Sequence, residues 1–208
     1  MCKAMIRVFI FFTIVIMASP LCAQKKLPKG IFGIKYGRYG GGTVAISDKG
    51  EYTNAGQYEG YRSYLNSAGK LELDTDDGYT FGVFVDYPTT KHTFAGIAFD
   101  IAHLDFGKDA KYLMNGAVFF KGNLHKEGGS FSFRPGLGLG VAMLPPVFVL
   151  NSATFFTIQA TGEAVIMANE RFGMFIDLGS MWAPAGGDGD FSITGGPFML
   201  MRAGLIFR

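Results

Sequence analysis

The chain has 208 residues, of which 49% are hydrophobic and 17% charged, and its formal net charge is +2. A charge so close to balance argues against a nucleic-acid-binding protein, which normally carries a basic excess. The 30 glycines and 21 phenylalanines are an unusual combination for a soluble domain. The apolar residues are scattered rather than gathered into a run long enough for a membrane-spanning helix, and this favours β-strands.

Residues 1–23 have the layout of a secretory signal peptide. A short basic start precedes an apolar run, Val8–Ala18, and the small residue Ala23 follows. A membrane anchor would need about 20 apolar residues, so we expect cleavage after Ala23. Both cysteines leave with this segment, as do two of the 19 basic residues, so that 17 (19 − 2) face 17 acidic ones. Residues 24–208 are therefore expected to form one domain without disulfides or cysteine metal sites.

The clearest signal in the rest of the chain is Phe131–Met143. Its odd positions carry apolar residues, whereas its even positions carry small or polar ones. Strict alternation predicts a strand, because successive side chains of a strand point to opposite faces. With a rise of ~3.3 Å per residue and a tilt of ~45°, this strand would span roughly 30 Å, the thickness of a membrane.

The same alternation recurs along the chain. The eight segments that show it are Gly30–Gly40, Tyr79–Tyr87, Phe94–Leu104, Tyr112–Phe120, Phe131–Met143, Phe155–Met167, Phe172–Trp182 and Phe198–Arg208. Eight strands make the smallest usual membrane barrel, and an even number returns both termini to one side. The sequence therefore predicts an all-β fold, an eight-stranded antiparallel up-and-down transmembrane β-barrel.

The connecting segments predict which end of the barrel faces outward. Short turns are expected on the periplasmic side at Pro88–His92 and Asn169–Arg171. The third connector on that side, Lys121–Gly129, is longer. The outer loops are expected at Gly41–Gly78, Asp105–Lys111, Leu144–Ala153 and Ala183–Gly196. Within the long first loop, residues 41–78, Thr43–Ile46 and Leu71–Leu73 could extend the first hairpin above the membrane.

Pointing the apolar positions of each strand toward lipid places polar residues inside the barrel. The predicted interior network is Lys35, Asp86, Asp100, Arg134, Gln159, Glu163, Asp177 and Arg202. Three bases thus meet four acids in a barrel scarcely wide enough for its own side chains, so the charges must pair. Glycines on the same face, such as Gly136, Gly138 and Gly140, would make room for long cations. Either a plugged barrel or a narrow path for ions or small solutes is compatible with this pattern.

Aromatic residues lie near the ends of the predicted strands. They are Tyr36, Tyr39, Tyr79, Tyr87, Tyr112, Phe172 and Trp182. This placement is typical of the interfacial girdles of membrane barrels. The alternative interpretation is a soluble barrel of lipocalin type. In such a barrel the outward apolar faces would form a large exposed patch, which soluble proteins avoid.

This layout resembles the small outer-membrane barrels of Gram-negative bacteria, of the OmpX and OmpA transmembrane type. The resemblance covers residues 24–208 as a pattern rather than as a specific motif. It implies a location in the outer membrane, with outer-membrane lipid and lipopolysaccharide as neighbours. The final segment, ending in Phe207 and Arg208, is similar to the signal that such proteins present to the barrel-assembly machinery, although that signal usually ends in an aromatic residue.

The first outer loop has the most distinctive predicted surface. It carries Tyr52, Tyr58, Tyr61 and Tyr64 among glycine, asparagine and serine residues. Tyrosines with small polar neighbours are typical of binding surfaces, because they give rigid contact area at little entropic cost. These residues form the candidate surface for binding another protein or a ligand, although a simple shielding loop would have a similar composition.

The sequence contains no catalytic or metal-binding pattern that we accept. Of the three histidines, His92 and His125 fall in expected periplasmic segments, and His103 lies near the outer end of its strand beside Asp105. No serine has a reason to join His103, so a lipid A-modifying enzyme is a weaker alternative. The acidic stretch Asp74–Gly78 lacks the glutamate of a calcium-binding loop. We therefore expect a non-enzymatic outer-membrane protein of structural or surface-interaction type without a cofactor.

Overall fold

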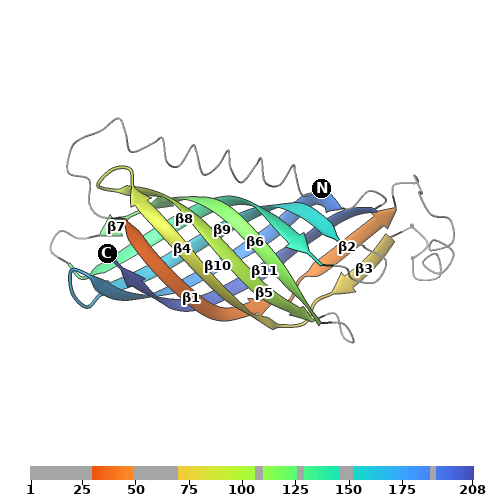
Figure 1. Ribbon diagram of the computed structural model, residues 1–208, viewed down its shortest axis with the longest axis horizontal. Coiled ribbons are helices and arrows are strands. Elements are labelled where there is room, and N and C mark those ends of the chain that lie inside the picture. The colour runs from red at the N-terminus through yellow and green to blue at the C-terminus, as the bar shows by residue number, and fades with distance from the viewer. Residues whose placement is uncertain (1–29, 49–69, 106–109, 126–128, 146–151, 188–190) are drawn as a thin grey trace.

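The computed structural model describes residues 30–48, 70–105, 110–125, 129–145, 152–187 and 191–208. Their strands are β1 Ile31–Gly40, β2 Thr43–Asp48, β3 Lys70–Asp74, β4 Gly78–Pro88, β5 Thr93–Asp105, β6 Ala110–Gly122, β7 Leu124–His125, β8 Phe131–Leu144, β9 Ala153–Met167, β10 Phe172–Gly187 and β11 Phe191–Phe207. No helix in these ranges is long and apolar enough to cross a membrane. Figure 1 shows the strands wound obliquely around one long axis.

Eight of these strands close into a barrel. Its antiparallel order is β1-β4-β5-β6-β8-β9-β10-β11, and β11 returns to pair with β1 from Phe32↔Phe207 to Gly40↔Met199. Closure leaves no free sheet edge within the ring, which is the condition for a sheet in hydrocarbon, where unpaired backbone groups are costly. The predicted fold class is confirmed, and each of the eight predicted segments coincides with one barrel strand.

One end of the barrel, which we call the extended end, continues beyond the ring. Here β2 pairs with β3 and with the first residues of β11, as Figure 1 shows, so the first hairpin is prolonged. The prediction that Ala183–Gly196 is a loop is wrong, because β10 runs to Gly187 and β11 begins at Phe191. The register of β10 shifts between Met181 and Gly187. Such bulges break the two-residue alternation and hide the strand from a periodicity argument.

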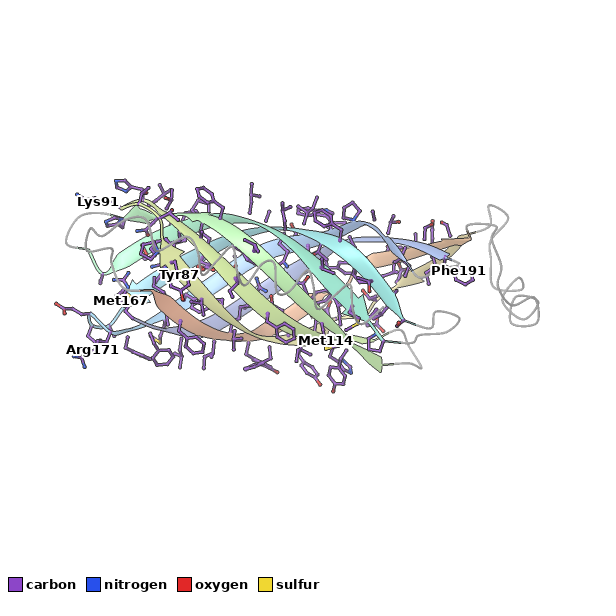
Figure 2. All side chains as sticks on the ribbon, turned by 45° about the horizontal axis from the view of Figure 1, so that its top comes forward. Tyr87, Lys91, Met114, Met167, Arg171 and Phe191 are labelled. Carbon is purple, nitrogen blue, oxygen red and sulfur yellow. The ribbon has the colours of Figure 1, made fainter. Side chains whose placement is uncertain are left out.

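The opposite end, which we call the turn end, holds the tight connections and the C-terminus (Figure 1). Figure 2 shows Lys91 and Arg171 projecting there, from the turns between β4 and β5 and between β9 and β10. The prediction that Lys121–Gly129 is a connector is wrong at its start, because Lys121 and Gly122 belong to β6. The short strand β7 then pairs with β8.

The two faces of the barrel wall differ in polarity. Large apolar side chains cover the outside, where Leu137 is 67% and Phe120 59% exposed, and Figure 2 shows side chains standing off the barrel all along its length. Interior apolar residues form two clusters, with the buried polar residues between and beside them. Tyr39 was expected in the outer girdle but is only 2% exposed, because its position on β1 faces inward, where its ring packs on Phe198.

The closing seam is tight at Gly37. A Cβ atom there would lie 2.1 Å from the carbonyl oxygen of Met201 and 2.5 Å from Cα of Arg202, both backbone atoms of β11. We expect Gly37→Ala to lower the free energy of unfolding by about 1–3 kcal/mol, as overpacking does. Heat-modifiable gel migration and urea unfolding measure this. Gly116→Ala on β6 is the control, because its Cβ would meet nothing within 4 Å. Equal stability of the two variants would contradict the tight seam.

Candidate functional site

The barrel interior brings together all eight residues of the predicted network. None is more than 5% exposed. The exposed fractions are Lys35 5%, Asp86 1%, Asp100 5%, Arg134 0%, Gln159 1%, Glu163 4%, Asp177 1% and Arg202 2%. They come from seven of the eight barrel strands, and each occupies a position that alternates with lipid-facing residues.

A further cation, Lys121, completes a cluster near the turn end. Its Nζ lies 3.0 Å from Oδ2 of Asp86 and 2.6 Å from Oε1 of Glu163. Sequence reasoning missed Lys121, although it has the inward parity of Phe119, two residues earlier on the same strand. With Lys121 included, the described buried side chains comprise four cations and four carboxylates. Full formal compensation replaces the predicted excess of one acid, as a narrow low-dielectric interior requires.

A second cluster lies deeper in the barrel. Lys35 Nζ is 2.9 Å from Oδ1 of Asp100, and the Arg202 guanidinium contacts the same carboxylate at 3.4 Å. Arg202 also bridges to Asp177, with Nε donating to Oδ2 at 2.8 Å. Beside this cluster, the hydroxyl of Thr157 donates to the Asn115 side-chain oxygen at 2.9 Å. The cluster is an alternating chain of charges in which each cation meets a carboxylate.

Arg134 differs from the other buried cations. It is 0% exposed, and none of its three side-chain nitrogens has a hydrogen-bond partner among the described residues. Its guanidinium lies over the ring of Phe94, 4.8 Å from the centroid, and its backbone is directly opposite Glu163. The aromatic face and the nearby carboxylate stabilise its charge electrostatically, without a direct bond.

Interior glycines give these charges their space. A Cβ at Gly82 would lie 2.1 Å from Oδ1 of Asp100, and one at Gly96 the same distance from Oδ1 of Asp86. Gly136 lies against the Lys121 side chain, as predicted for a glycine beside a long cation. Gly138 instead accommodates the ring of Phe119. The small residues therefore make room for aromatic rings as well as for charges.

An aromatic layer separates the two charged clusters. The rings of Phe84 and Phe175 meet edge to face at 5.5 Å. Lys121 Nζ lies 4.5 Å from the centroid of Phe84 and 5.5 Å from that of Phe119, whose ring is also 6.0 Å from Lys35 Nζ. Cation–π contacts of this kind add to the stabilisation of buried ammonium groups.

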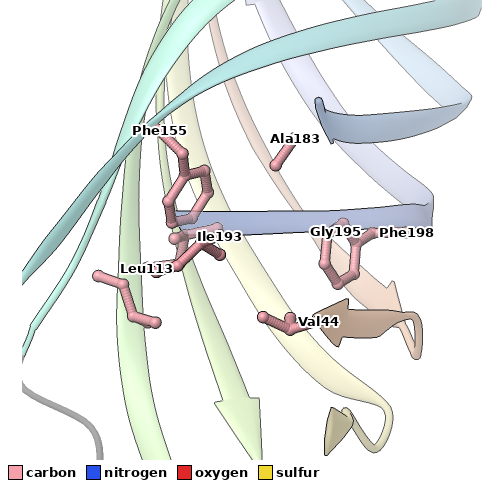
Figure 3. Close-up of a pocket in the computed structure, with 8 residues that line it drawn as sticks. Val44, Leu113, Phe155, Ala183, Ile193, Gly195 and Phe198 are labelled. Carbon is pink, nitrogen blue, oxygen red and sulfur yellow. The ribbon is translucent and has the colours of Figure 1, made fainter. Parts of the chain in front are cut away.

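Toward the extended end the interior becomes apolar. A cluster that includes Tyr39, Leu113, Phe155, Ile193 and Phe198 fills it. Figure 3 shows a small pocket, with a volume of about 10 Å³, that is lined by members of this cluster such as Leu113, Phe155 and Phe198. A second cavity of about 10 Å³ lies between this cluster and the Asp100–Arg202 pair. Such a volume holds about one water molecule at most.

The histidines form no catalytic arrangement in the described chain. The His103 ring stacks on Tyr79 and meets Tyr112 edge to face, without a hydrogen bond to a serine or a carboxylate. At the turn end, the rings of His92 and His125 are 5.9 Å apart. No group of three or more His, Cys, Asp or Glu side chains in the described ranges is placed to hold a metal ion.

The remaining predicted residues fall in two places. Phe207 ends β11 at the seam, where its ring lies 6.3 Å from Phe32 of β1 and 5.6 Å from Phe172 of β10. The predicted loop tyrosines 52, 58, 61 and 64 and the predicted signal peptide, residues 1–23, lie outside the described residues.

Comparison with known proteins supports the fold rather than a family. No family model and no curated protein sequence matches the chain. The outer membrane protein OprG from Pseudomonas aeruginosa is similar in structure, with a TM-score of 0.50 and 11% identity over 88% of this chain and 98% of that one. Ail, the attachment invasion locus protein of Yersinia pestis, matches with a TM-score of 0.38 and 13% identity over 86% and 99%. The chain has the architecture of the small outer-membrane β-barrels.

The interior network predicts a strong dependence on Lys121. Lys121→Met leaves Asp86 and Glu163 buried without their cation, so we expect unfolding to become easier by about 3–5 kcal/mol. Urea unfolding in lipid vesicles, followed by emission of the single tryptophan, Trp182, measures the change. Adding Glu163→Gln should recover part of the loss. Lys91→Met in an exposed turn is the control, and a similar loss there would refute the role of Lys121.

Proposed function

We propose that the chain is a non-enzymatic integral protein of the bacterial outer membrane, with a closed lumen and with its interactions at the extended end. The observation that carries the proposal is the filled interior. Two compensated charge clusters, an aromatic layer and an apolar cluster occupy it in succession. The two cavities described above, one within the apolar cluster and one beside it, have volumes of about 10 Å³ each and are too small for a solute.

The membrane location rests on the outer face. Exposed apolar side chains occur on all eight barrel strands, and a surface of this size would be unfavourable in water. The closed ring of strands suits a hydrocarbon surrounding, and the likeness to an outer membrane protein in fold agrees with it. Export through the signal peptide predicted at residues 1–23 would bring the chain to that membrane.

The extended end is the part best placed to meet other molecules. The hairpin of β2 and β3 prolongs the wall there, and Glu72 and Asp74 of β3 are exposed. The segment of the sequence between these two strands contains the four predicted surface tyrosines, at positions 52, 58, 61 and 64. We propose that a surface protein or ligand binds at this end and that Phe207, at the other end of the seam, serves recognition by the barrel-assembly machinery.

A non-enzymatic role accords with the surroundings of His103. Two tyrosine rings enclose it, and neither a nucleophile nor an orienting carboxylate of the described chain hydrogen-bonds to it. Nucleophilic catalysis needs a base within hydrogen-bond reach of the attacking group. Lipid A mass spectra from cells with and without the protein would expose a lipid-modifying activity if there were one.

Planar-bilayer recording tests the closed lumen. We expect the refolded protein to give no reproducible unitary conductance, because charged and aromatic side chains fill the lumen. A conductance that changes with Arg134→Ala or Glu163→Gln would establish the alternative, a narrow channel. Arg171→Ala is the matched control, since this arginine is exposed in a turn outside the lumen and its removal should have no effect.

A further inference from the structure

Four side chains from adjacent strands form a row on the outer wall near the extended end. Arg38 of β1 is directly opposite Tyr79 of β4, and His103 of β5 is directly opposite Tyr112 of β6. The pairing of Thr80 with Ala102 brings Tyr79 beside His103, and the two rings stack at 4.9 Å with 3° between their planes. We call these four residues the outer-wall row. Figure 1 shows their strands side by side.

Arg38 is the unusual member of the outer-wall row. Among the described side chains of the eight barrel strands, it is the one charged group that points away from the lumen. It is exposed, and it forms no ion pair or hydrogen bond with the described residues. The four cations inside the barrel are compensated by four carboxylates, whereas this one has no such partner.

The position of Arg38 along its strand limits the depth at which it can lie. On the outer side of β1 it follows Phe32, Ile34 and Tyr36, and it is the last outward side chain before the strand ends at Gly40. Met199 of β11, opposite Gly40, is still exposed. An arginine facing lipid costs about 2–4 kcal/mol at the midplane of a membrane and about 0–1 near the interface. Because Arg38 is two residues from the end of β1, the low-cost depth for its charge is that of the lipid headgroups at the extended end, where anionic phosphate groups are found.

The other members of the row offer fixed hydrogen-bond donors. The hydroxyl oxygens of Tyr79 and Tyr112 are 3.2 Å apart, so the two side chains meet at their tips. The ring of His103 is held between them, stacked on Tyr79 and 5.3 Å from Tyr112 in an edge-to-face contact. Because these contacts restrain the rings, an anion would meet donors that are already positioned.

We propose that the outer-wall row binds the phosphate group of a phosphorylated glycolipid in the surrounding leaflet. Arg38 would supply the charge-assisted hydrogen bonds, since a guanidinium matches the geometry of phosphate. The one tyrosine hydroxyl whose proton is not used in the bond between Tyr79 and Tyr112, together with a ring N–H of His103, would add further donors. In an outer membrane this lipid is lipid A, the phosphorylated anchor of lipopolysaccharide. The site rests on the proposed membrane location but not on the closed lumen.

Native mass spectrometry of the refolded protein, titrated with purified lipid A carrying phosphate, tests the site. We expect Arg38→Gln to weaken lipid A binding about tenfold or more, as the loss of a charge-assisted contact implies. The double variant Tyr79→Phe, Tyr112→Phe keeps both rings and removes only the hydroxyls, and it should weaken binding about threefold. Lipid A stripped of phosphate should bind the wild-type protein as weakly as the phosphorylated form binds Arg38→Gln.

Arg171→Gln at the turn end is the matched control, because it removes an exposed arginine of equal charge from a place far along the chain from the row. An equal loss of lipid A binding in this variant would mean that any exposed positive charge attracts the lipid, and it would overturn the proposed site. Unchanged binding by Arg38→Gln would overturn it too, as would equal binding of a phospholipid. Flotation with vesicles separates the two proposals. A protein that fails to insert refutes both, whereas one that inserts without dependence on Arg38 refutes the lipid site alone.

Discussion

The pairing of β1 with β11 is the constraint on which the rest of the molecule depends. A strand edge facing hydrocarbon would leave backbone groups unsatisfied at several kcal/mol each, so the sheet must close on itself. Closure brings the backbone of β11 against Gly37, where a side chain has no space. It also gathers Phe32, Phe172 and Phe207 at the turn end of the seam, so that two ring contacts link three strands in one aromatic cluster.

Closure with eight strands creates a narrow interior that the described side chains largely fill, and this determines the chemistry inside. The backbone ladder joins only neighbouring strands, whereas all the ion pairs described above except Arg202–Asp177 join strands that are not neighbours. Lys121 of β6 reaches Asp86 of β4 and Glu163 of β9, and Arg202 of β11 reaches Asp100 of β5. Buried ion pairs contribute little net stability compared with well-packed apolar residues, but removing one partner of a pair is costly because the other charge is left buried alone. The main role of the network is therefore to fix the positions of the barrel strands relative to one another.

The alternation of apolar and polar residues was enough to predict the eight barrel strands and to point eight polar side chains inward. This alternation did not predict strand residues where a bulge interrupts the period of two, or where a charged residue continues the period at the end of a strand. Bulges in β10 and the glycines beyond them concealed the strand residues of 183–196. Lys121 keeps the inward parity of Phe119, but a lysine after two phenylalanines resembles the start of a turn. Which charges meet depends on register and shear, which composition does not encode.

The described charged residues inside the barrel and the one on its outer wall, Arg38, differ in how their charges are compensated. Inside, the described charges form a set whose formal charges sum to zero. Outside, Arg38 forms no ion pair with a carboxylate of the described residues, and it lies next to restrained tyrosines and a histidine toward the extended end. A membrane barrel can tolerate such a charge where the surrounding solvent supplies the counter-ion. In a bilayer that solvent is the lipid itself, so the lipid site that we propose would make the outer wall near the extended end part of the binding surface of the protein.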